Sequence, residues 1–160
     1  MQIRLAQEAD QNAVVGIVAP VLQAGETYAM PSDFTDEQAR DYWFSPAHQV
    51  FVAQENGAVL GTYYLKPNQL GPGAHVANCG YMTAPAAQGK GVARAMCQHS
   101  LESARVHGFR AMQFNHVVST NERAVRLWQS LGFAIVGTLP SAFNHPVHGF
   151  VDSYVMFREL

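Results

Sequence analysis

Residues 81–93 read YMTAPAAQGKGVA, where a β-rich run passes into a turn with two glycines and then into a helix. That helix is predicted over residues 92–107, with Gly108 ending it. Free backbone N–H groups at a helix start, with the positive end of the helix dipole behind them, suit a pyrophosphate. Gly89 and Gly91 have no Cβ and let the backbone approach phosphate oxygens. Lys90 adds a positive charge. The turn is therefore a candidate phosphate-binding loop.

Two familiar phosphate-binding patterns are excluded at this turn. A P-loop requires four residues between its glycines and a Gly-Lys-Ser/Thr ending, and the turn has neither. The dinucleotide pattern Gly-x-Gly-x-x-Gly fails at its third glycine, where Arg94 stands. The turn instead fits Gln/Arg-x-x-Gly-x-Gly/Ala, with Gln88, Gly91 and Ala93 at the defined positions.

A second segment, NERAVRLWQSLGF at residues 121–133, follows one predicted helix and one predicted strand later. Together the two segments resemble the GCN5-related N-acetyltransferase (GNAT) superfamily. Its coenzyme A loop has the first pattern, and its next helix has the pattern Asn-x-x-Ala-x-x-Leu-Tyr-x-x-x-Gly-Phe. The resemblance extends over roughly residues 50–160.

The resemblance implies that acetyl-CoA is the co-substrate. Residues 82–84 are expected to pair their backbone with the pantetheine amides, as an added strand would. Asn121 is expected to contact the pantetheine arm, although it is also a good helix N-cap. The expected cofactor-binding residues are Met82, Thr83, Ala84, Gln88, Gly89, Lys90, Gly91, Val92, Ala93, Asn121 and Trp128.

Trp128 departs from the family pattern, in which many members carry tyrosine. A tyrosine can return a proton to the leaving thiolate, whereas an indole N–H is only a hydrogen-bond donor. Trp128 is therefore expected either to hydrogen-bond the sulfur or to serve as a packing residue of an amphipathic helix. Proton return then comes from water or from the protonated amine itself.

Three asparagines suggest a finer resemblance. The segments GAHVAN at 73–78, QFN at 113–115, TN at 120–121 and VGTLPSAF at 136–143 look like fungal acetyltransferases that act on azetidine-2-carboxylate and related proline analogues. This resemblance implies that Asn78 and Asn115 anchor the substrate. Amides hydrogen-bond both carboxylates and amines without titrating near neutral pH. The alternative is that these asparagines only cap loops or tie backbone groups together.

The early loop GETYAMP, residues 25–31, usually covers the acceptor pocket in this superfamily. Glu26 is a candidate general base, directly or through water. Tyr28, Phe34 and Trp43 are candidate pocket-lining residues. A solvated glutamate beside a small satellite core is the alternative interpretation. The candidate catalytic residues are thus Asn115, Asn78, Trp128 and Glu26, with Asn78, Asn115, Tyr28 and Phe34 as candidate substrate contacts.

Strand and helix patterns predict an α+β (mixed α/β) fold, with a mostly antiparallel twisted sheet of about seven strands and about four covering helices. Asn56-Gly57 marks a hairpin. The resemblance adds a splay between strands 75–83 and 111–117. Strands are expected at 1–5, 49–54, 59–65, 75–83, 111–117, 134–139 and 151–158, and helices at 7–18, 32–44, 92–107 and 121–131.

Composition points to one ordinary globular domain over residues 1–160, with 48% hydrophobic and 14% charged residues. A net charge of −2 gives no reason to expect nucleic acid or an anionic membrane as partner. Cys79 and Cys97 suggest reduced core residues of a cytoplasmic protein. His145 and His148 have a ligand-like spacing, but two ligands in a loop make a poor metal site, so no metal is expected.

The predicted reaction is acetyl transfer to the amine of a small molecule in a ternary complex, with a backbone N–H near residues 82–83 stabilising the oxyanion. The acceptor could be an amino acid or a proline-like analogue. Three alternatives remain: acetylation of a protein N-terminus, a non-catalytic coenzyme A sensor, and a structural dimer module. A homodimer is permitted by the exposed strands and the apolar segment 143–150.

Overall fold

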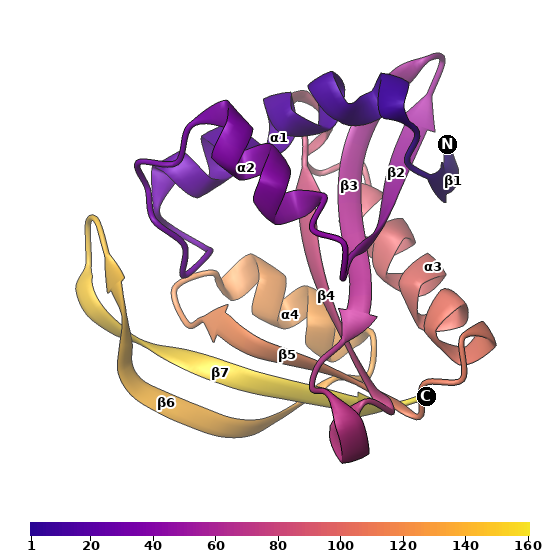
Figure 1. Cartoon of the computed structure of the whole chain (residues 1–160). Coiled ribbons are helices and arrows are strands. Elements are labelled where there is room, and N and C mark those ends of the chain that lie inside the picture. Colours follow the sequence, from indigo (N-terminus) through magenta and orange to yellow (C-terminus); the bar gives the residue numbers. More distant parts are fainter.

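The computed structural model describes residues 1–160 as a single sheet with helices on both faces (Figure 1). Three short 3-10 turns, η1 to η3, join the elements. The strands are β1 (Gln2–Leu5), β2 (Gln49–Glu55), β3 (Ala58–Pro67), β4 (Val76–Thr83), β5 (Ala111–Val118), β6 (Ala134–His145) and β7 (Gly149–Glu159). The helices are α1 (Gln11–Ala24), α2 (Asp36–Trp43), α3 (Val92–Val106) and α4 (Glu122–Ser130).

The seven strands lie in the order β1-β2-β3-β4-β5-β7-β6. Every neighbouring pair is antiparallel except β4 and β5, which are parallel. The predicted mixed, mostly antiparallel sheet with four helices is confirmed.

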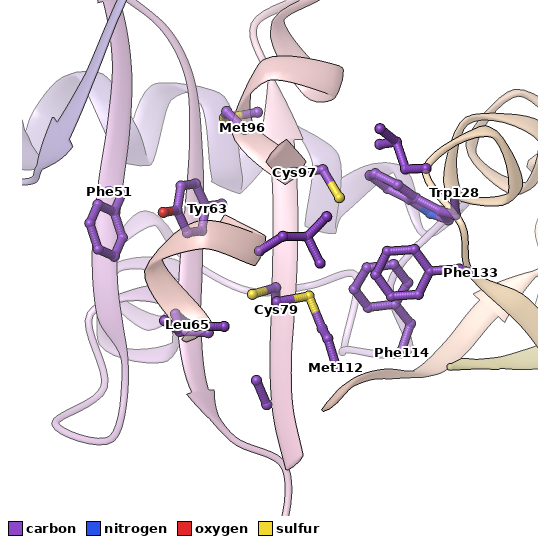
Figure 2. Packing of buried hydrophobic residues seen from close by; sticks show 14 of the residues in the cluster. Phe51, Tyr63, Leu65, Cys79, Met96, Cys97, Met112, Phe114, Trp128 and Phe133 are labelled. Carbon is purple, nitrogen blue, oxygen red and sulfur yellow. The ribbon is translucent and has the colours of Figure 1, made fainter. Parts of the chain in front are cut away.

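Two hydrophobic clusters hold the helices to opposite faces of the sheet. Helices α1 and α2 pack on one face through a cluster that includes Leu22, Trp43 and Tyr64. Helices α3 and α4 pack on the other face, and Figure 2 shows part of that cluster, with Trp128 beside Phe114 and Phe133. Alternate residues of β4 enter different clusters, since Met82 packs toward α1 while Cys79 packs toward α3. One face of β4 therefore packs against the α1–α2 layer, and the other packs against the α3–α4 layer.

Helix α1 is longer than predicted. The expectation of a helix over 7–18 followed by an irregular stretch is wrong, because the helix continues through Pro20 to Ala24. The buried side chain of Leu22 and the left-handed Gly25, which caps the end at φ 65°, stabilise the extra turn despite the proline. Helix α2 begins at Asp36 rather than at 32. Thr35, the residue before it, forms a capping box with Gln38 and so sets the start of the helix.

The last two strands form a longer hairpin than predicted. Strand β6 runs to His145 instead of ending at 139, and β7 begins at Gly149 instead of at 151. Register shifts between Leu139 and Phe143 absorb the irregular residues. Among them Ser141 has a φ of 52° and donates its backbone N–H to Asp152. A side-chain acceptor thus carries the strand across a segment that its sequence marks as a break.

A buried polar contact joins α2 to the sheet and gives a stability prediction. The Thr62 hydroxyl accepts from the Trp43 indole at 3.0 Å and donates to the Phe51 carbonyl at 2.8 Å, and both side chains are wholly buried. Thr62→Val keeps the shape but leaves the indole N–H without a partner. We expect the free energy of unfolding in urea to fall by about 2 kcal/mol.

The double variant Thr62→Val/Trp43→Phe supplies the control, because it removes the donor as well. The fall in the free energy of unfolding should be about 1 kcal/mol smaller in the double variant than the sum of the falls in the two single variants. Strict additivity, or a Thr62→Val variant as stable as wild type, would show that this contact does not hold α2.

Candidate active site

The parallel strands β4 and β5 part almost as soon as they meet. Only Val76 with Ala111 and Ala77 with Met112 are in register, although both strands continue for several residues more. From residue 78 onward the β5-facing edge of β4 pairs with no strand. The predicted splay between these strands is confirmed, and it opens toward the glycine turn.

The open edge of β4 presents the backbone groups of alternate residues. At one end of the β3–β4 ladder, Ala84 donates to the Leu60 carbonyl at 2.9 Å, and at the other Asn68 donates to the Val76 carbonyl at 2.7 Å. Antiparallel bonding alternates along a strand, so Met82 also faces β3, while the N–H groups of Tyr81 and Thr83 face the opening. This restricts the predicted oxyanion donor to Tyr81 or Thr83.

The glycine turn offers free donors at the start of α3. The N–H groups of residues 89 and 91–94 donate to no group of the chain, whereas Gln88 and Lys90 donate to Pro85 and Ala87 inside the turn. Four residues of the predicted loop therefore retain free amides, and two do not. Gly89 and Gly91 have φ of 80° and 78°, a conformation that L residues with a Cβ rarely adopt.

Arg123 is a residue of this loop region that the sequence analysis missed. A Cβ built on Gly89 would lie 3.9 Å from its Nη2, so the guanidinium lies beside the turn. Arg123 forms no hydrogen bond or ion pair, whereas Arg126 of the same helix pairs with Glu122 at 2.9 Å. Its position two residues after Asn121 was the available signal, because the start of α4 faces the same opening.

Asn121 and Trp128 lie on α4 beside the splay. The Asn121 side chain accepts from the Ala124 N–H at 3.3 Å, so it caps the helix as its alternative interpretation required. Trp128 is buried, with its ring 5.0 Å from Tyr81 and 5.2 Å from Phe114. Its indole N–H donates to no group of the chain. The residue packs in the core and retains a free donor.

Asn78 and Asn115 brace the two strands where they part. Asn78 Nδ2 donates to the Gln113 carbonyl at 2.9 Å. Asn115 accepts from the Gln113 side chain at 2.8 Å and donates to Asn68 at 2.6 Å. The structure thus brings the two predicted asparagines together with Asn68 and Gln113, which the sequence analysis did not name.

The early loop reaches the same region through Tyr28. Its hydroxyl donates to the Tyr81 carbonyl at 3.1 Å, and burial raises the pKa of this phenol above its usual range. Phe34 packs at the border of the α1–α2 cluster. Glu26 is exposed and forms no hydrogen bond or ion pair, so nothing in the structure directs it to the opening.

Neither cysteine is a nucleophile at neutral pH. Burial raises the pKa of the Cys97 thiol to about 12 and raises that of Cys79 still further above its usual range. No cluster of three metal-ligating side chains is present, and no helix is long and apolar enough to span a membrane.

The cysteine pKa values give a test by alkylation. Because a raised pKa keeps a thiol protonated as the pH increases toward that value, native Cys97 should carry almost no thiolate at pH 8.5. A thiol in the urea-unfolded chain is about half ionised there. Iodoacetamide labelling, measured by mass spectrometry, should be at least about 100-fold slower in the native protein. Equal native and unfolded rates would contradict the assignment.

Comparisons with known proteins agree with this geometry. The acetyltransferase (GNAT) family model matches residues 20–133. A GCN5-related N-acetyltransferase from Kribbella flavida is 50% identical, with a TM-score of 0.94 over 99% of this chain and 97% of that one. The N-acetyltransferase aca1 of Schizosaccharomyces pombe is 30% identical over 84% of this chain and 72% of its own length.

The L-amino acid N-acyltransferase MnaT of Escherichia coli is also 30% identical, over 88% of this chain and 83% of its own length. The family match covers most of the chain, including the free amides of the turn and the helix that begins at Asn121. The chain therefore belongs to the acetyltransferase (GNAT) family and is an N-acetyltransferase enzyme that uses acetyl-CoA.

Proposed function

We propose that this enzyme transfers the acetyl group of acetyl-CoA to the amine of a small, amino-acid-like molecule, within a ternary complex. The observation that carries the proposal is that two sets of unpaired backbone donors lie close together in the chain, one in the turn at 89 and 91–94 and the other on the open edge of β4 at Tyr81 and Thr83. That open edge begins at the polar brace around Asn78 and Asn115.

The turn is suited to the phosphates of the co-substrate. Free amides at a helix start bind anions, and the Arg123 guanidinium adds a charge-assisted donor beside them. The pantetheine amides can then pair with the groups of Tyr81 and Thr83 that face the opening, as a strand added to a sheet edge would.

Transfer itself requires no covalent enzyme intermediate. The neutral amine attacks the thioester carbonyl, the C–N bond forms and the C–S bond breaks, and the amine loses its proton to water or a base. An N–H of Tyr81 or Thr83 stabilises the negative charge on the carbonyl oxygen. The leaving thiolate accepts a hydrogen bond from the Trp128 indole and takes its proton from water, because an indole is not a practical acid. Glu26 remains a candidate base.

A small acceptor is favoured over a protein N-terminus for two reasons. The amides of Asn78 and Asn115 lie at the mouth of the splay, where Asn78 donates to the Gln113 carbonyl and Asn115 bonds the side chains of Gln113 and Asn68. In addition, the E. coli relative is named an L-amino acid N-acyltransferase. The resemblance to fungal enzymes for proline analogues adds cyclic amino acids to the candidates.

An acceptor panel tests this proposal. Thiol release from acetyl-CoA should occur with amino acids or proline analogues, and initial rates with both substrates varied should give intersecting reciprocal plots. Short peptides with free N-termini are the comparison set. Turnover of peptides but of no amino acid would contradict the small acceptor. Parallel reciprocal plots would contradict the ternary complex.

Arg123 gives a second prediction, on the co-substrate side. Arg123→Ala should raise KM for acetyl-CoA roughly tenfold, since a charge-assisted contact to phosphate is lost. With S-acetyl-pantetheine, which has no phosphate, the variant should equal wild type. Acetyl-dephospho-CoA keeps the pyrophosphate but lacks the 3′-phosphate, so KM for this compound shows which of the two groups Arg123 contacts.

Arg126→Ala is the matched control, because Arg126 lies one turn further along α4 and is already paired with Glu122. It should leave KM for acetyl-CoA within twofold. The role of Arg123 is refuted if both variants raise KM equally, or if Arg123→Ala is equally impaired with S-acetyl-pantetheine.

A further inference from the structure

The side-chain amides at the splay leave few donors for an acidic acceptor. Asn115 uses its oxygen for Gln113 and an N–H for Asn68, and Asn78 uses an N–H for the Gln113 carbonyl. The Oδ1 of Asn78 accepts no hydrogen bond, and an oxygen repels a carboxylate. If the acceptor carries a carboxylate, other groups must supply most of its donors.

Two buried polar atoms on residues beyond Asn115 lack partners. Strand β5 has one extra residue at Asn115 and His116, between the register pairs Phe114 with Met156 and Val117 with Tyr154. His116 forms no hydrogen bond, and its Nδ1 is buried. The hydroxyl of Ser153, which is wholly buried, also has no partner. Buried polar groups without partners are rare in proteins and call for an explanation, such as a ligand.

These two side chains share one face of the sheet. Val117 packs into the cluster under α3 and α4, so its neighbour Val118 faces the opposite side. Ser153 is in register with Val118, and His116 precedes it by two residues. Both therefore face the α1–α2 side, away from the expected path of the co-substrate.

His145 brings a third unused group to this region. Its ring is buried, and its Nδ1 accepts from the backbone N–H groups of Val147 at 3.1 Å and His148 at 3.3 Å. An accepting Nδ1 carries no proton, so the neutral ring holds its proton on Nε2. That Nε2–H donates to no group of the chain. The hairpin turn thus presents His145 as a donor.

A line of aromatic contacts joins His145 to the bulge. The ring of Phe143 lies 6.3 Å from that of His145 and 5.9 Å from that of His116. Figure 1 shows that the β6–β7 hairpin bends upward at its tip, toward the level of the α1–α2 connection. Phe143 therefore links His145 to His116, which is the neighbour of Asn115 in the bulge of β5.

We propose that the acceptor carries a carboxylate, and that the Nε2–H of His145, together with His116, binds it. This inference rests on the proposed transfer to a small amine and makes the β6–β7 hairpin the part of the enzyme that selects acids.

His145→Asn is the most direct test. The asparagine oxygen can still accept from the amides of Val147 and His148, so the turn is retained, while the Nε2 donor is lost. Substrates are the best amino-acid acceptor of the panel and its carboxamide. For the acid, kcat/KM should fall at least roughly tenfold, mainly through KM, as expected for a lost hydrogen bond to a charge. For the carboxamide it should stay within twofold of wild type.

Two further variants complete the test. His116→Phe retains the packing against Phe143 and should also lower kcat/KM for the acid alone. His107→Asn makes the same change at an exposed histidine at the end of α3, outside the hairpin, and should alter the kinetics with neither substrate. The inference is overturned if His145→Asn slows acid and carboxamide equally, or if His107→Asn is equally selective against the acid. A wild-type enzyme that acetylates no small amine would instead refute the proposed function itself.

Discussion

The parting of β4 from β5 is the constraint on which the rest of the structure depends. Two parallel strands inside a sheet would normally satisfy each other's backbone groups along their whole length. Here only two register pairs form, and the remaining edge of β4 stays open in the middle of the molecule. An open edge in a sheet interior is costly unless something pairs with it, so the fold holds the binding surface for an extended ligand ready.

In the proposed reaction, this opening also separates the two substrates. Helices α3 and α4 supply free amides, Arg123 and Trp128 on one face of the sheet. The other face has the α1–α2 connection, the bridge from Asn78 to Gln113, and the β6–β7 hairpin. In the proposed ternary complex, the thioester and the amine meet where the sheet itself is interrupted. Such an arrangement favours direct attack, and the protonated cysteines give the enzyme no competing nucleophile.

Much of this organisation follows from local sequence. The glycine turn, the helix after it, the hairpin at Asn56-Gly57 and the sheet class are short-range features, and the structure has them as predicted. The misses arise from tertiary contacts. Burial of Leu22 stabilises the part of α1 that follows Pro20. A hydrogen bond from the Ser141 N–H to Asp152 stabilises β6 where its sequence predicts a break. One partner of Asn115 is Asn68, which lies 47 positions away in the sequence, and no local pattern reveals such a contact.

The central claim is that the free amides of the turn and of β4 hold the co-substrate. Residue-resolved amide exchange by NMR, with and without coenzyme A, tests it most directly. The account predicts added protection at Gly91, Val92, Ala93, Tyr81 and Thr83, and little change at Gln88 and Lys90, whose amides are already bonded within the turn. Tight binding of coenzyme A that left the first group unprotected would contradict it.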